Sequence, residues 1–99
     1  MLIVNKKGVN YGFDVDQAKS VGVNIHYLIE ETTEGELVVE VAGISKGEAR
    51  RQIKQGSVWL GNERCTSFEE IMPLGGNAAM TLFIGKELKG VIVPFNVGL

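Results

Sequence analysis

Paired start and stop signals mark two short helices in the middle of this sequence. Each start is a Ser or Thr followed three residues later by Glu, a capping box in which the two residues satisfy free backbone N–H groups of the first turn. Each stop is a glycine, which readily adopts the left-handed conformation that ends many helices. The residues concerned are Thr33, Glu36 and Gly43 in the first segment and Ser45, Glu48 and Gly56 in the second. We therefore expect helices from Thr33 to Ala42 and from Ser45 to Gln55.

The first of these segments also carries a signal for the opposite structure. Its run Leu37–Val41 is rich in β-branched residues, which lose side-chain freedom in a helix and favour strands. Composition thus favours a strand, while the capping box and the closing glycine favour a helix. The prediction here follows the caps.

Short strands are expected before the two helices. Leu2–Val4 and Val9–Val15 form a hairpin around a turn at 6–8, whose glycine supplies the positive φ of a hairpin bulge. A short helix over 17–20 follows. The segment 23–31 fits both an alternating strand and a helix, and of these we favour the strand.

After the second helix the sequence alternates between strands and turns. A third capping box, Ser67 with Glu70, predicts a short helical turn that Pro73 stops. The remaining expected elements are a strand at Val58–Leu60, a tight turn at Gly61–Asn62, a loop at Gly75–Asn77, and a final hairpin of Met80–Ile84 and Leu88–Val93 around a turn at 85–87.

These elements add up to an α+β domain with a small mixed β-sheet and two or three short helices. A chain of 99 residues has the size of one domain, so we treat 1–99 as a single domain. The longest apolar runs are far too short to cross a bilayer, no secretion signal is recognised, and the lone Cys65 cannot form an internal disulfide. We therefore expect a cytoplasmic protein with no membrane segment and no cofactor.

Charge is distributed unevenly along the chain. The formal net charge is −2, whereas RNA-binding domains are usually basic. The segment 26–43 carries five glutamates and no Lys or Arg, and the segment 44–64 that follows it carries five Lys or Arg and two Glu. An acidic block thus runs directly into a basic one.

The basic block lies mainly on the second predicted helix. At 3.6 residues per turn, Ala49 and Ile53 share one face, which we expect to be buried. The basic side chains form a stripe on another face, made of Lys46, Arg50 and Lys54 with Arg51 beside it. Like charges at this spacing repel one another weakly, so the stripe suggests an anionic partner. The spacing alone nevertheless favours a solvated face, or one that packs on the acidic block, because charged helix faces are usually just solvated.

The segment Ile44–Arg64 also carries a specific spacing of residue types. The positions concerned are Ser45, Ala49, Arg50, Ile53, Gly56 and Val58. In these positions the segment resembles the alpha-L RNA-binding motif of a small-subunit ribosomal protein, pseudouridine synthases and tyrosyl-tRNA synthetases. The likeness is closest to the C-terminal domain of bacterial tyrosyl-tRNA synthetases. It implies an alpha-L-like core over 33–93, preceded by an N-terminal extension, 1–32, of unknown role.

The resemblance also implies a function, the non-catalytic binding of structured RNA such as tRNA or rRNA. The residues that it implies in phosphate contacts are Lys46, Arg50, Arg51, Lys54, Arg64 and Lys86. Arg suits phosphate because its planar fork donates two parallel hydrogen bonds, whereas Lys acts as a point charge. The final hairpin carries only Lys86 and Lys89, fewer cations than the family has. This favours an alternative, a protein-interaction or structural module that keeps the fold without RNA and assembles with itself or with a larger partner.

Other residues are weaker candidates for a site. Cys65 and His26 could suggest nucleophilic catalysis, but neither stands in a recognisable catalytic pattern, so a structural role is favoured for both. The glutamates between 30 and 40 lack the Asp-rich loop of a calcium site, and we expect no metal. Trp59 and Phe83 could stack on bases, but on predicted strands a place in the core is favoured.

Overall fold

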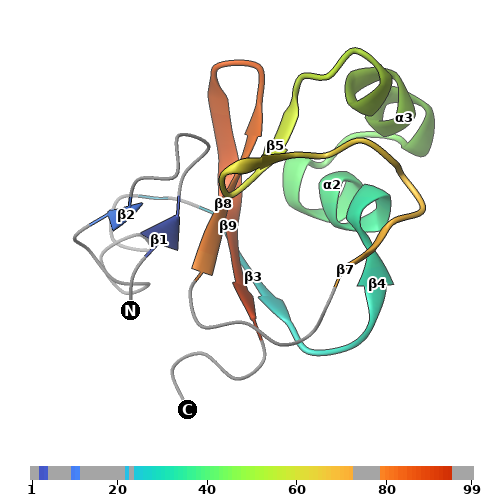
Figure 1. Cartoon of the computed structure of the whole chain (residues 1–99). Coiled ribbons are helices and arrows are strands. Elements are labelled where there is room, and N and C mark those ends of the chain that lie inside the picture. Colours follow the sequence, from blue (N-terminus) through green and yellow to red (C-terminus); the bar gives the residue numbers. More distant parts are fainter. Residues whose placement is uncertain (1–2, 5–9, 12–21, 23, 73–78, 95–99) are drawn as a thin grey trace.

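The computed structural model describes residues 3–4, 10–11, 22, 24–72 and 79–94, and in this part of the chain it contains two α-helices and nine short strands (Figure 1). The helices are α2, Glu34–Ala42, and α3, Lys46–Lys54. The strands are β1, Ile3–Val4; β2, Asn10–Tyr11; β3, Ile25–Leu28; β4, Thr32–Thr33; β5, Val58–Leu60; β6, Glu63–Arg64; β7, Ile71–Met72; β8, Ala79–Ile84; and β9, Glu87–Pro94. The architecture is α+β, as predicted.

A mixed sheet built around the hairpin β8–β9 forms the centre of the molecule. One edge of β8 pairs with β5 in antiparallel and with β1 in parallel orientation, and the outer neighbours of these strands are β6 and β2. On the other side of the hairpin, β3 runs parallel to β9. The short strands β4 and β7 form a separate antiparallel pair. In Figure 1 both helices lie on one side of the central hairpin, and β1–β2 lie on the opposite side.

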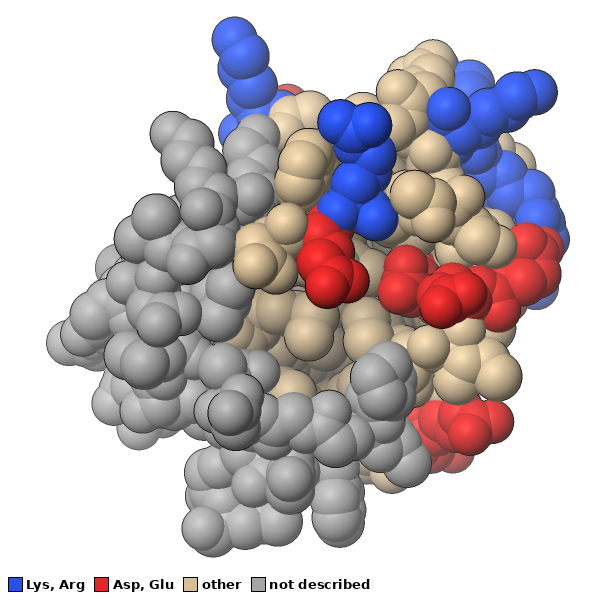
Figure 2. Space-filling model, viewed as in Figure 1, with Lys and Arg blue, Asp and Glu red and all other residues tan. Residues whose placement is uncertain are grey.

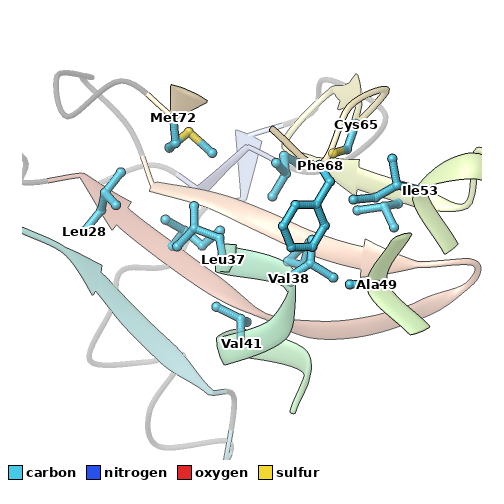
Figure 3. Packing of buried hydrophobic residues seen from close by; sticks show 13 residues of the cluster. Leu28, Leu37, Val38, Val41, Ala49, Ile53, Cys65, Phe68 and Met72 are labelled. Carbon is cyan, nitrogen blue, oxygen red and sulfur yellow. The ribbon is translucent and has the colours of Figure 1, made fainter. Parts of the chain in front are cut away.

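The two helices bury their apolar faces against the sheet (Figure 3). The helix-side core consists of Leu37, Val38 and Val41 from α2, Ala49 and Ile53 from α3, Leu28, Val58, Leu60, Met72, Leu82 and Ile92 from strands, and Cys65 and Phe68 from the segment between β6 and β7. The predicted buried face of α3 is therefore confirmed. Most of the stability of helices this short comes from such packing rather than from intrinsic propensity.

The caps of α2 decide the conflict between its ends and its β-branched interior. The Thr33 hydroxyl accepts a hydrogen bond from the backbone N–H of Glu36 at 3.2 Å. At the other end Gly43 adopts a left-handed conformation with φ 67° and donates its N–H to the carbonyl of Val39 at 3.0 Å. The predicted helix is confirmed: both of its ends are capped, and two of its three valines, Val38 and Val41, are buried in the core.

The cap of α3 provides a stability prediction. The Ser45 hydroxyl accepts from the N–H of Glu48 at 3.1 Å, so Ser45→Ala leaves that N–H to water alone. We expect the free energy of unfolding to fall by about 0.5–2 kcal/mol, measured by chemical denaturation. Thr66→Ala is the control, because Thr66 is exposed and makes no hydrogen bond to a described residue. Equal stability of the two variants would contradict the capping role.

The third capping box coincides with the short turn that it predicts, and this turn does not extend into a helix. Residues 67–70 make a single turn, in which the N–H of Glu70 approaches the carbonyl of Ser67 at 3.4 Å, and the chain continues into β7. The reason is that the first turn of α2 uses this segment's carbonyls: the N–H of Glu34 donates to Glu70 at 2.8 Å, and that of Gly35 donates to Phe68 at 2.9 Å. These bonds hold the segment against the start of α2.

Most other predicted elements are confirmed where the structure describes them. β1 and β2 are antiparallel as expected of the N-terminal hairpin, and the ambiguous segment 23–31 contains the strand β3. Gly61–Asn62 is the turn between β5 and β6, and the final hairpin is β8–β9. The predicted helix over 17–20 and the loop Gly75–Asn77 lie outside the described residues. Among the described helices, none has the length and apolar character needed to cross a membrane.

Candidate functional site

All six basic residues predicted to contact RNA are exposed at the surface. Four of them stand on α3, one on β6 and one in the turn between β8 and β9. Figure 2 shows Lys and Arg side chains along the upper part of this face, over α3 and the tip of β8–β9, with Asp and Glu side chains below them. The uneven charge of the sequence is thus also uneven in space.

Three of the six cations are already paired with carboxylates of the same chain. Lys46 Nζ lies 3.3 Å from a carboxylate oxygen of Glu36, Arg50 Nη1 lies 2.6 Å from Glu69, and Arg51 Nε donates to Glu48 at 2.9 Å. The hydrogen bonds from Arg50 and Arg51 lower the pKa of the Glu69 and Glu48 carboxyls. A phosphate that used these cations would have to displace a carboxylate from each.

Arg50 has a second contact, which makes it part of the fold. Its guanidinium carbon lies 4.1 Å from the centre of the Phe68 ring, and Phe68 is a buried core residue. A cation over an aromatic ring is attracted by the ring's negative face. Together with the bond to Glu69, this contact fastens the segment between β6 and β7 to the outside of α3.

The other three cations form what we call the cationic rim, defined as Lys54, Arg64 and Lys86. None of them makes an ion pair with a described residue. Lys54 stands in the last turn of α3, where the helix dipole favours a positive charge. The rim is therefore the part of the predicted site that makes no ion pair with a described carboxylate.

The elements that carry the cationic rim meet at the turn after α3. Gly56 has φ 77°, and a Cβ built on it would lie 3.5 Å from Cδ of Arg64, so that side chain runs beside the turn. The N–H of Gly85 donates to the carbonyl of Ser57 at 2.8 Å, which holds the β8–β9 turn there as well. Lys86 follows Gly85 directly, and Lys54 precedes Gly56 by two residues. Three segments of the chain, each carrying one of these cations, thus lie beside the turn after α3.

Trp59 and Phe83 are only half-buried and are not among the core residues, so the prediction that favoured a place in the core is wrong. Both are half-buried and are direct cross-strand neighbours in the pair β5–β8. Alternate residues of a strand point to opposite faces, and the flanking Val58 and Leu60 take the face toward the helices. The two aromatic rings therefore belong to the outer face of the sheet, and the guanidinium of Arg64 lies 5.2 Å from the Trp59 ring centre.

Cys65 is a structural residue, as predicted. Its side chain is buried in the helix-side core, and the thiol approaches the carbonyl oxygen of Ser67 at 3.7 Å. Burial and, to a lesser extent, the neighbouring Glu34 carboxylate raise the pKa of the thiol to about 12. A thiol in this state has almost no thiolate at neutral pH, so it is a poor nucleophile and a poor metal ligand.

A shallow pocket of about 240 Å³ lies at the end of β3, away from the cationic rim. It is lined by His26, Tyr27, Leu28, Ile29, Glu30, Glu31, Thr32 and Glu40. His26 Nε2 lies 3.5 Å from a carboxylate oxygen of Glu40 across its wall. The side chains of Tyr27 and Ile29 are 48% and 69% exposed. This surface therefore presents apolar groups beside the carboxylates of the pocket.

The described residues contain no group of three or more His, Cys, Asp or Glu side chains placed to hold a metal ion. Comparison of the chain with protein families, with curated proteins and with solved structures finds no match. The function proposed for it therefore depends on the geometry of its own residues.

Proposed function

We propose that this chain binds structured RNA, tRNA or rRNA, without catalysis, as a domain with an alpha-L-like core. The observation that carries the proposal is the cationic rim, whose three cations stand on elements that meet at one corner of the fold and make no ion pair with a described carboxylate. A corner of this kind suits the closely spaced phosphates of a nucleic acid. Contacts of this type position an RNA by shape and charge and carry little sequence information.

The ion pairs on α3 divide the predicted contact set into two classes. Phosphates reach the rim without breaking a described ion pair, whereas Lys46, Arg50 and Arg51 first have to leave their carboxylates. We therefore place the principal phosphate contacts at the rim. The three paired cations contribute less, although the resemblance implies all six.

A salt titration tests this proposal and its division of the site. Each neutralised phosphate releases counterions, so the rim alone predicts a slope of log K against log salt of about −2 to −3, whereas all six cations predict about −4 to −5.5. Binding of bulk tRNA and of rRNA fragments is measured by fluorescence anisotropy over a range of salt. No binding to either RNA at about 50 mM salt would contradict the proposal.

Two substitutions on the same helix separate the two classes of cation. Lys54→Ala is expected to weaken binding and to reduce the magnitude of the salt slope by about 1. Arg51→Ala is the matched control, because Arg51 is also exposed on α3 but is bonded to Glu48, and it should change the slope little. The reverse ranking would place the contacts on the helix stripe instead of the rim.

The exposed surface at the end of β3 favours a second candidate function, the binding of a protein partner. Tyr27 and Ile29 offer apolar area beside the carboxylates of Glu30, Glu31 and Glu40. Self-association or a stable partner would appear in the mass of the native protein in solution. A monomer that purifies alone would count against this alternative and leave the RNA proposal in place.

A further inference from the structure

One row of side chains crosses four strands on the outer face of the sheet. Arg64 pairs with Trp59, Trp59 pairs with Phe83, and Phe83 pairs with Leu88, so that β6, β5, β8 and β9 each contribute one residue. Directly paired residues of antiparallel strands send their side chains to the same face. We call these four residues the outer row.

The outer row is the solvent-accessible part of a sheet face that is buried further along β8 and β9. Thr81 and Val91, paired with each other further along β8 and β9, are exposed by 2% or less although they are outside the helix-side core. In contrast, Leu88 is 40% exposed, Trp59 and Phe83 are half-buried, and Arg64 is exposed. An apolar surface with two aromatic rings thus reaches solvent beside the cationic rim, to which Arg64 also belongs.

Arg64 belongs both to this apolar surface and to the cationic rim. Its guanidinium lies over the Trp59 ring, and the aliphatic part of its side chain runs beside Gly56. These two neighbours restrict the side chain and leave its charge without a described carboxylate. A guanidinium held over an indole ring can carry a further flat group, since bases stack on Arg planes as well as on aromatic rings.

We propose that the outer row binds unpaired nucleotides of the RNA, with a base stacked on the Arg64–Trp59 pair and its phosphates on the cationic rim. This inference rests on the proposed function and narrows its partner to RNA with a loop, bulge or single-stranded end. Bases inside a duplex are already stacked on their neighbours and present only their edges in the grooves, so they cannot use such a surface. The positive rim beside the aromatic rings is what selects a nucleic acid over an uncharged ligand.

Trp59 is the only tryptophan of the chain, so its fluorescence reports directly on the outer row. The probes are a single-stranded RNA and a fully paired duplex RNA of the same length. We expect the single strand to quench Trp59 fluorescence and to bind on the order of 10-fold more tightly than the duplex, while the duplex leaves the emission unchanged. Equal affinity for the two RNAs without quenching overturns this inference and leaves general RNA binding intact. Failure of both RNAs to bind overturns the inference together with the proposed function.

Substitution of Arg64 separates stacking from charge. Arg64→Lys keeps the positive charge but loses the planar group, so we expect it to weaken single-strand binding on the order of 10-fold while duplex binding stays nearly unchanged. Lys86→Arg is the matched control, which keeps the charge of the rim without touching the outer row, and its affinity for both RNAs should not fall. Unchanged melting temperatures establish that both variants are folded. If Arg64→Lys binds the single strand as tightly as the unsubstituted chain, the stacking role is refuted.

Discussion

Gly35→Ala is expected to destabilise the protein by about 1–3 kcal/mol or more, although alanine is the better helix former. A Cβ on Gly35 would lie only 2.1–2.5 Å from three carbons of the Phe68 ring. The ring cannot simply withdraw, because the N–H of Gly35 donates to the carbonyl of Phe68 at 2.9 Å and Arg50 covers the ring at 4.1 Å. The gain in helix propensity, up to about 1 kcal/mol, is therefore smaller than the cost of the clash.

Gly47→Ala is the matched control for this prediction. Gly47 is the second residue of α3, as Gly35 is the second residue of α2, but a Cβ there meets no atom within 4 Å. With no clash, we expect Gly47→Ala to stabilise the protein by up to about 1 kcal/mol, chiefly by restricting the unfolded chain. Urea denaturation of both variants measures the difference. A change of the same sign in both would show that the contact with Phe68 does not limit the first turn of α2.

The helices were predictable because their signals are local. Each capping box and each closing glycine lies within one segment, and the structure uses the hydroxyls of Thr33 and Ser45 as the pattern predicts. At Ser67 the same local pattern produces only a single turn, because the carbonyls of Phe68 and Glu70 accept hydrogen bonds from the first turn of α2. That competition comes from residues more than 30 positions away, so no local pattern reports it.

Contacts between distant segments account for the other differences. The parallel pairing of β1 with β8 joins residues 3–4 to residues 79–80, and such pairing leaves no mark in either short segment. Likewise, the basic stripe was evident at helical spacing, but the partner of Arg50 is Glu69, 19 positions further along. Spacing along one helix therefore indicated which cations are exposed, and only the tertiary structure separates paired cations from the rim.

Which residues of the sheet are buried also depends on contacts that no single segment of the sequence reports. Strand alternation puts Trp59 on the face opposite to Val58 and Leu60, but it does not say which face the helices cover. In the structure α2 and α3 lie over Val58 and Leu60, which leaves Trp59 on the outer face with Arg64 above it. An aromatic residue on a strand was thus a sound candidate for the core. The helices cover the opposite face of the sheet, however, and Trp59 is only half-buried.

Alkylation of Cys65 in the folded protein is expected to be about a thousandfold slower than in the unfolded chain at about pH 8. The pKa of this thiol is raised from 9.0 to about 12, first by burial and then by the hydrogen bond and charge of Glu34. At a fixed pH below both values, this rise in pKa lowers the fraction of thiolate by about 10³. The thiolate is the form that reacts with the alkylating agent. Since Cys65 is the only cysteine, labelling with iodoacetamide, with and without denaturant, measures this rate directly. Comparable rates in the two states would contradict the buried, neutral thiol.

The same raised pKa fixes the direction of a pH effect on stability. A group that holds its proton more tightly when folded stabilises the fold below its unfolded pKa, and this contribution is lost as pH rises through the folded value. For Cys65 the loss therefore begins near 9.0 and continues toward about 12. Cys65→Ser keeps a small donor but does not ionise in this range, so we expect its stability to fall less steeply over the same interval, as followed by urea denaturation. Parallel stability curves for the two proteins would show that another group controls the alkaline transition.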